Sequence, residues 1–107
     1  MAEDIEYTVG SGNVYADLGY EQPEEMQAKA ELVFRLAHIL EERGLTQTQA
    51  AEILGIPQPK VSALLRGHFA GFSLERIFRL LIALDNDVSI VVNPKGEEHG
   101  HLSVVAR

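Results

Sequence analysis

The chain has 107 residues, of which 46% are hydrophobic and 23% charged, and it carries a net charge of −7. These proportions lie near globular averages, so they predict one domain with one core and exclude wholesale disorder. The absence of cysteine excludes disulfide scaffolds and thiolate sites. No apolar run approaches the length of a membrane span, and the acidic N-terminus does not have the pattern of a secretory signal.

The negative charge is unevenly distributed along the chain. Residues 1–42 hold ten acidic and two basic side chains, which gives −8, whereas residues 43–79 hold two acidic and five basic ones, which gives +3. Residues 80–107, with four acidic and two basic side chains, contribute −2. The whole chain is therefore unsuited to non-specific binding of nucleic acid, but its middle third can present a small positive surface.

Residues 1–22 are expected to form an irregular N-terminal arm. Turn-forming residues are frequent there, including Gly10, Gly12 and Gly19, and scattered apolar side chains permit one short strand. A phosphate-binding loop at Gly10–Gly12 is not expected, because no helix begins directly after it.

The pattern predicts a first helix over about residues 23–43. Pro23 suits the first helical position, because a backbone N–H there would have no hydrogen-bond partner within the helix. Gly44 favours the left-handed conformation that ends a helix. An amphipathic stripe recurs at helical spacing, as expected of a helix that packs on a core. Its members are Met26, Ala30, Val33, Ala37 and Leu40.

Three shorter helices are predicted to follow. Thr46 and Gln49 form a capping box at the start of the second helix, and Gly55 ends it. Ser73 is a good N-cap for the fourth helix. The helix between them is expected over about residues 59–66.

The start of that third helix contains two prolines. Pro59 is expected at the first helical position, with Gln58 in the cap and Pro57 stiffening the turn. Gly67 ends the helix. The sequence therefore predicts a rigid turn that directs Gln58 and Lys60 outward.

The C-terminal part is expected to contain strands. A turn at residues 85–87 precedes alternating side chains over 88–92, which predict one strand, and residues 102–105 predict a second. The nine residues between them, 93–101, are many for a tight hairpin. Two pairings of 102–105 therefore stay open, one with 88–92 and one with a partner chain.

Residues 47–66, QTQAAEILGIPQPKVSALLR, fit a helix-turn-helix. Two short helices that cross steeply need a small residue at the crossing, Ala51, and a turn residue that tolerates positive φ, Gly55. Val61 supplies a branched apolar side chain directed at the preceding helix. The remaining inward positions are Ala50, Leu54, Ile56 and Leu64.

Over about residues 32–84 the sequence resembles the XRE family of phage repressor and Cro-type DNA-binding domains, through the pattern LTQxxAAxxLGIxQxxVSxLxxG. The resemblance implies a mainly α, compact helical bundle with a lambda-repressor-like helix-turn-helix, an N-terminal arm and a short C-terminal strand or hairpin. It also implies that the third helix is the recognition helix and enters the major groove of DNA.

The resemblance assigns DNA contacts residue by residue. Gln58 falls where the family reads a base edge, and a glutamine amide can pair with adenine. Pro59 and Ala63 depart from the family's polar pattern, so direct readout is expected to be sparse and DNA shape and dimer spacing to matter more. The candidate DNA-binding residues are Thr46, Gln47, Gln58, Pro59, Lys60, Ser62, Ala63, Arg66 and His68.

The predicted organisation is an arm at 1–22, a DNA-binding domain at 23–86, and C-terminal strands at 87–107 that serve dimerisation together with the fourth helix. The predicted function is a sequence-specific transcriptional regulator that binds operator DNA as a homodimer. The alternative, from a resemblance to HigA-type antitoxins, is an antitoxin that neutralises a small basic RelE/HigB-like toxin and represses its own operon. The acidic first third would suit such a basic partner, or solubility alone.

Other functions are not expected. No nucleophile–base pair or carboxylate pair is placed by spacing, so the chain is not predicted to be an enzyme. His99 and His101 lack a fixed third ligand, so neither a metal nor another cofactor is expected. With no membrane segment and a DNA target, the expected location is the cytoplasm, in association with the nucleoid.

Overall fold

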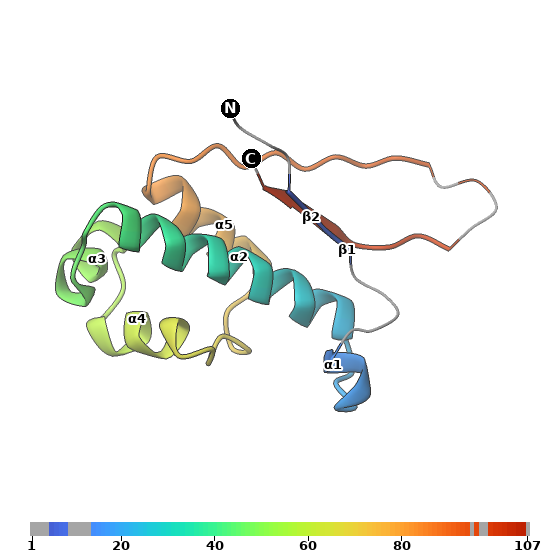
Figure 1. Cartoon of the computed structure of the whole chain (residues 1–107), viewed down its shortest axis with the longest axis horizontal. Helices are drawn as coiled ribbons and strands as arrows, with labels where there is room; N and C mark the ends of the chain where they lie inside the picture. Colours follow the sequence, from blue (N-terminus) through green and yellow to red (C-terminus); the bar gives the residue numbers. More distant parts are fainter. Residues whose placement is uncertain (1–4, 9–13, 95, 97–98, 107) are drawn as a thin grey trace.

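One long helix, α2 (Pro23–Glu42), runs through the computed structural model and carries the other elements along its sides (Figure 1). The structure describes residues 5–8, 14–94, 96 and 99–106. Most of these residues are helical, which confirms the predicted mainly α fold. The elements are β1 (Ile5–Thr8), α1 (Val14–Asp17), α2, α3 (Gln47–Leu54), α4 (Gln58–Leu65), α5 (Leu74–Ala83) and β2 (Ser103–Ala106).

The predicted N-caps form as side-chain hydrogen bonds. Thr46 Oγ1 accepts the backbone N–H of Gln49 at 3.1 Å, and Gln49 Oε1 accepts the N–H of Thr46 at 2.9 Å, which confirms the capping box of α3. Ser73 Oγ accepts the N–H of Arg76 at 3.1 Å and caps α5. Each cap satisfies an N–H that the first helical turn leaves without a partner.

The helices α2 to α5 are each followed, within two residues, by a residue with positive φ. Gly55, after α3, has a φ of 69°, as its role in the turn requires. Asp85, after α5, has a φ of 65°, although it is not a glycine. At each end the two residues after the helix donate their backbone N–H groups to carbonyls of the last turn. The chain therefore turns sharply after each helix without leaving those carbonyls unpaired.

The core lies where α2 meets α4 and α5. The stripe of α2 faces this core, with Ala30 and Ala37 half-buried at its margin. The largest side chains that are fully buried are Leu36, Leu64, Ile77, Leu84 and Val61. Because these residues come from α2, α4 and α5 and the turn after α5, their burial holds the helices as one unit.

The sheet joins the two ends of the chain. β1 and β2 pair antiparallel, with Ile5 opposite Ala106 and Thr8 opposite Ser103. The predicted strand at 88–92 is wrong, since that segment is extended but pairs with no strand among the described residues. The short N-terminal strand is confirmed, and α1 is a helix that the sequence pattern did not indicate. Gly10–Gly12 lies outside the described residues.

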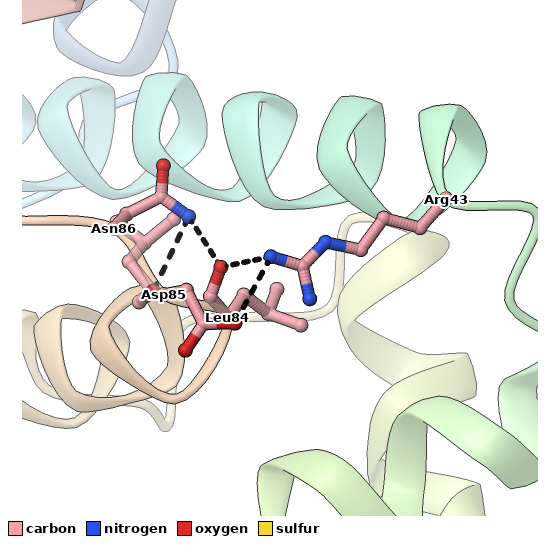
Figure 2. Close-up of polar contacts among 5 residues, drawn as sticks. Arg43, Leu84, Asp85 and Asn86 are labelled. Atoms are coloured by element: carbon pink, nitrogen blue, oxygen red, sulfur yellow. Dashed lines mark hydrogen bonds and ion pairs between the residues drawn. The ribbon is translucent and has the colours of Figure 1, made fainter.

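One arginine ties the C-terminal ends of α2 and α5 together (Figure 2). Arg43, directly after α2, donates from Nη2 to the backbone carbonyl of Leu84, and the same nitrogen lies 3.5 Å from Asp85 Oδ2. The Asn86 side-chain amide donates to the same carbonyl at 3.0 Å. These bonds satisfy a carbonyl at the end of α5 and fix where the C-terminal segment leaves the helices.

Glu24, in the first turn of α2, holds the residues just before β2. Its Oε1 lies 2.9 Å from His101 Nδ1, and its Oε2 accepts the Leu102 N–H at 3.2 Å. The pKa of Glu24 is held below its usual range, mainly by the hydrogen bond to His101 and also by the one to Leu102. The N-terminal end of α2 is thereby connected to β2.

We expect Glu24→Gln to loosen this connection in a pH-dependent way. Because the folded pKa of Glu24 is lowered, its contribution to stability is present above the unfolded pKa and is lost as the pH falls through the folded pKa. Hydrogen exchange at the Leu102 amide should be faster in the variant than in the wild type at neutral pH. The difference in thermal stability should disappear in acid, whereas the exposed control Glu21→Gln should change neither measurement. Unchanged exchange at Leu102 would contradict the connection.

Candidate nucleic-acid interface

α3 and α4 pack against each other as the helix-turn-helix pattern predicts. Val61 and Leu64 of α4 are each 1% exposed, which places one side of this short helix in the core. Ala51 of α3 is half-buried and packs against the same core, where its methyl group is small enough for the helices to approach. With one side of α4 buried, its first turn remains exposed to solvent.

The start of α4 differs from the prediction by one residue. Pro57 is the N-cap, with extended φ and ψ of −61° and 145°, Gln58 is the first helical residue and Pro59 the second. The second position tolerates proline because the first-turn N–H groups have no helical partner. The Pro57 carbonyl accepts the N–H of Lys60 at 2.9 Å and begins the helix. Gln58 therefore lies within the helix rather than in the cap.

A hydrogen bond joins the two glutamines that begin α3 and α4. Gln58 Nε2 donates to Gln47 Oε1 at 2.7 Å, across eleven positions in the sequence. The bond uses one N–H of the Gln58 amide and leaves its second N–H and its Oε1, the pair of groups that matches adenine. Both glutamines were predicted as DNA contacts, but their contact with each other was not, because no local pattern encodes it.

Basic side chains lie beside the first turn of α4. Lys60 is exposed, and its Nζ lies 5.8 Å from the ring centroid of Phe72. Arg76, near the start of α5, lies over the same ring with Cζ at 4.5 Å. Both cations thus lie over one aromatic ring, each in a cation–π arrangement. The sharing of Phe72 by Lys60 and Arg76 arises only in the folded chain, so no local sequence pattern indicates it.

The other predicted contact residues occupy positions of different exposure. Thr46 uses its hydroxyl in the capping box. Arg66 is exposed at the end of α4, and its Nε donates to the Ser62 carbonyl at 3.3 Å. The exposed members are Pro59, Arg66 and His68, and the half-buried ones are Ser62 and Ala63. The structure therefore brings the predicted residues together at the start of α3, on α4 and in the turn after it, with Gln58, Pro59, Lys60, Arg66 and His68 exposed.

The described part of the chain holds neither a metal-binding cluster nor a membrane-spanning helix. There, no three His, Asp or Glu side chains come together in a way that could hold a metal ion. His101 instead contacts Glu24. Among the same residues, no helix combines the length and apolar character needed to cross a membrane.

Comparison with known proteins identifies the family. A family model described as a helix-turn-helix domain matches residues 14–93. A solved structure of an XRE-family transcriptional regulator is 45% identical and superposes with a TM-score of 0.72, over 78% of this chain and 97% of that one. The chain belongs to the XRE family of helix-turn-helix transcriptional regulators. A search of curated proteins finds no match.

We expect Ala51→Leu to destabilise the XRE domain. The added methylenes would enter the contact between α3 and the core, and overpacking of this kind costs about 1–3 kcal/mol. Urea unfolding should show a lower midpoint with an unchanged slope. Ala83→Leu, at an exposed position near the end of α5, is the matched control and should leave the midpoint nearly unchanged. Equal stability of the two variants would refute the predicted crossing.

Proposed function

We propose that the chain binds operator DNA with α4 in the major groove, and that Gln58 reads a base edge there. The supporting observation is the Gln47–Gln58 hydrogen bond of 2.7 Å at the exposed start of α4. A glutamine held by a neighbour loses less side-chain entropy when it meets a base. The amide groups that remain, one N–H and Oε1, suit the N7 and N6 positions of adenine.

The other side chains of this surface divide between base and backbone contacts. Pro59 and Ala63 present only apolar groups, which can contact a thymine methyl. Lys60, Arg66 and Arg76 are exposed cations beside α4, so they suit phosphate groups on either side of the groove. This division predicts few base-specific contacts and a larger number of contacts that position the helix.

A homodimer completes this proposal. One domain offers few phosphate contacts, and a chain of net charge −7 gains little from non-specific attraction to DNA. Two copies would place their recognition helices in half-sites roughly 34–36 Å apart and combine their contacts. Specific binding would then depend on the spacing of half-sites as well as on their sequence.

We expect Gln58→Ala to weaken binding to the selected operator by roughly 1–3 kcal/mol and to relax base preference at one position of each half-site. The measurement is selection from random DNA followed by titration of matched and mismatched sites. Glu52→Ala, at an exposed position of α3, serves as the control for substitution near the site. The recognition-helix assignment is wrong if Gln58→Ala leaves both affinity and base preference unchanged.

We expect Lys60→Ala, Arg66→Ala and Arg76→Ala each to weaken all sites by a similar factor. A phosphate contact carries no sequence information, so base preference should persist while the slope of log K against log salt falls by about 1 for each cation removed. Arg79→Ala is the matched control, because Arg79 pairs with Glu75 at 2.7 Å on the same helix. A cation whose removal leaves the salt slope unchanged is not a phosphate contact.

The alternative function that we infer is that of an antitoxin whose acidic N-terminal third binds a small basic toxin. The charge of −8 over residues 1–42 supports it, since complementary charge favours association. Asp17 and Glu21 are exposed members of this region.

The alternative calls for a charge-reversal experiment rather than a deletion. Removal of residues 1–22 would also remove β1, the partner of β2. If a small basic reading frame lies beside the gene, its product should co-purify with the wild type. The double variant Asp17→Lys, Glu21→Lys should lose that product and keep operator binding, whereas the control Glu75→Lys, at an exposed position of α5 outside residues 1–42, should keep both. Retention of the product by the double variant would exclude this acidic site.

A further inference from the structure

A single aromatic ring connects the first turns of α4 and α5. Lys60, the third residue of α4, places Nζ 5.8 Å from the centroid of the Phe72 ring. Arg76, the third residue of α5, places Cζ 4.5 Å from the same centroid. The π electrons of an aromatic ring attract a cation at such distances. Two cations from different helices are therefore held by one side chain, which belongs to the connection between those helices.

The ring itself is held by the core. Phe72 is 6% exposed and packs in the same hydrophobic cluster as Val61, Leu64 and Ile77. Its backbone N–H donates to the Phe69 carbonyl at 2.9 Å, within the turn that joins α4 to α5. Side chains packed in a core stay close to one rotamer. The Phe72 ring is therefore a fixed support for the two cations rather than a mobile contact.

An aromatic ring and a carboxylate hold a cation with different consequences for DNA binding. Arg79, the next arginine of α5, pairs with Glu75 at 2.7 Å, and a phosphate that binds Arg79 would have to displace that carboxylate. The Phe72 ring is uncharged, so it restricts the side chains of Lys60 and Arg76 without neutralising them. A side chain that is already restricted loses less entropy when it binds a partner.

We propose that Phe72 is a positioning residue of the DNA-binding surface, whose ring directs Lys60 and Arg76 toward phosphate groups without itself contacting DNA. The inference rests on the proposed function and names the side chain that prepares two of its cations. Loss of the ring should affect both cations at once. Because a phosphate contact carries no sequence information, that loss should weaken every DNA site alike.

A double-mutant cycle on DNA affinity tests this role. Phe72→Leu removes the ring and keeps an apolar side chain in the core, and it should weaken matched and mismatched sites alike by about tenfold. In a chain that already carries Lys60→Ala and Arg76→Ala, the same substitution should change the affinity by less than about twofold, because neither cation remains to be positioned. All four proteins are compared at one low salt concentration, at which the weakest of them still binds.

Phe69→Leu is the matched control for loss of a buried ring. Phe69 is 5% exposed and packs in the same core, but no cation lies over its ring among the described residues. Both Phe→Leu variants should lower the midpoint of urea unfolding. Only Phe72→Leu should lower the DNA affinity of the folded protein.

A measurement without DNA keeps this inference separate from the proposed function. An aromatic ring shifts the NMR signals of protons that lie over it. The methylene protons next to the charged groups of Lys60 and Arg76 should therefore be shifted upfield in the free wild-type protein. These shifts should disappear in Phe72→Leu and persist in Phe69→Leu.

Each contrary result has a definite meaning. The proposal is overturned if Phe72→Leu leaves the affinity unchanged, if it causes the same loss in the chain without the two cations, or if Phe69→Leu weakens binding as much. Absence of the upfield shifts in the wild type would overturn it as well, because the ring would then not hold the cations. A wild type that shows the shifts but binds no DNA would reject the proposed function, and with it the role of Phe72 in DNA affinity, while confirming the contacts of the ring.

Discussion

The burial of Val61 and Leu64 on one side of α4 is the constraint on which the rest of the structure depends. An eight-residue helix with two fully buried side chains can rotate very little about its axis. That rotation decides which residues of its first turn meet solvent, and it places Gln58 within reach of Gln47 on α3. The capping box of α3 and the turn at Gly55 fix the partner helix. A short helix of low intrinsic stability is thereby held by tertiary packing rather than by its own propensity.

α2 holds the other elements of the chain in place along its side and at both of its ends. Its core side supports α4 and α5, Arg43 at one end holds the end of α5, and Glu24 at the other holds the approach to β2. The helix-turn-helix and the approach to β2 are therefore positioned by one element, through contacts at different places along it. A substitution on one side of α2 should leave the other side intact unless it disturbs the core between them.

The local features of the helices could be predicted from the sequence, and the long-range contacts could not. The cap at Thr46 and the turn at Gly55 depend on residues a few positions apart, so their side-chain chemistry is visible in the pattern. The start of α4 was misplaced by one residue because proline fits the first and second helical positions alike. Alternation at 88–92 indicated an extended backbone but not its partner, and β2 pairs instead with β1 at the other end of the chain. The Gln47–Gln58 bond and the sharing of Phe72 by Lys60 and Arg76 likewise depend on how helices meet.

The acidity of the chain bears on how such a regulator could select its site. A net charge of −7 lowers attraction to DNA in general, while the cations beside α4 preserve a small local attraction where the helix would dock. Specificity is the difference between the two affinities, so weakening non-specific binding raises it even when base contacts are few. In the proposed complex, Gln58, held by the uncharged Gln47, would add discrimination without adding charge. In the proposed complex, such a surface would depend strongly on two half-sites acting together, because each half-site alone would supply few contacts against the repulsion from the rest of the chain.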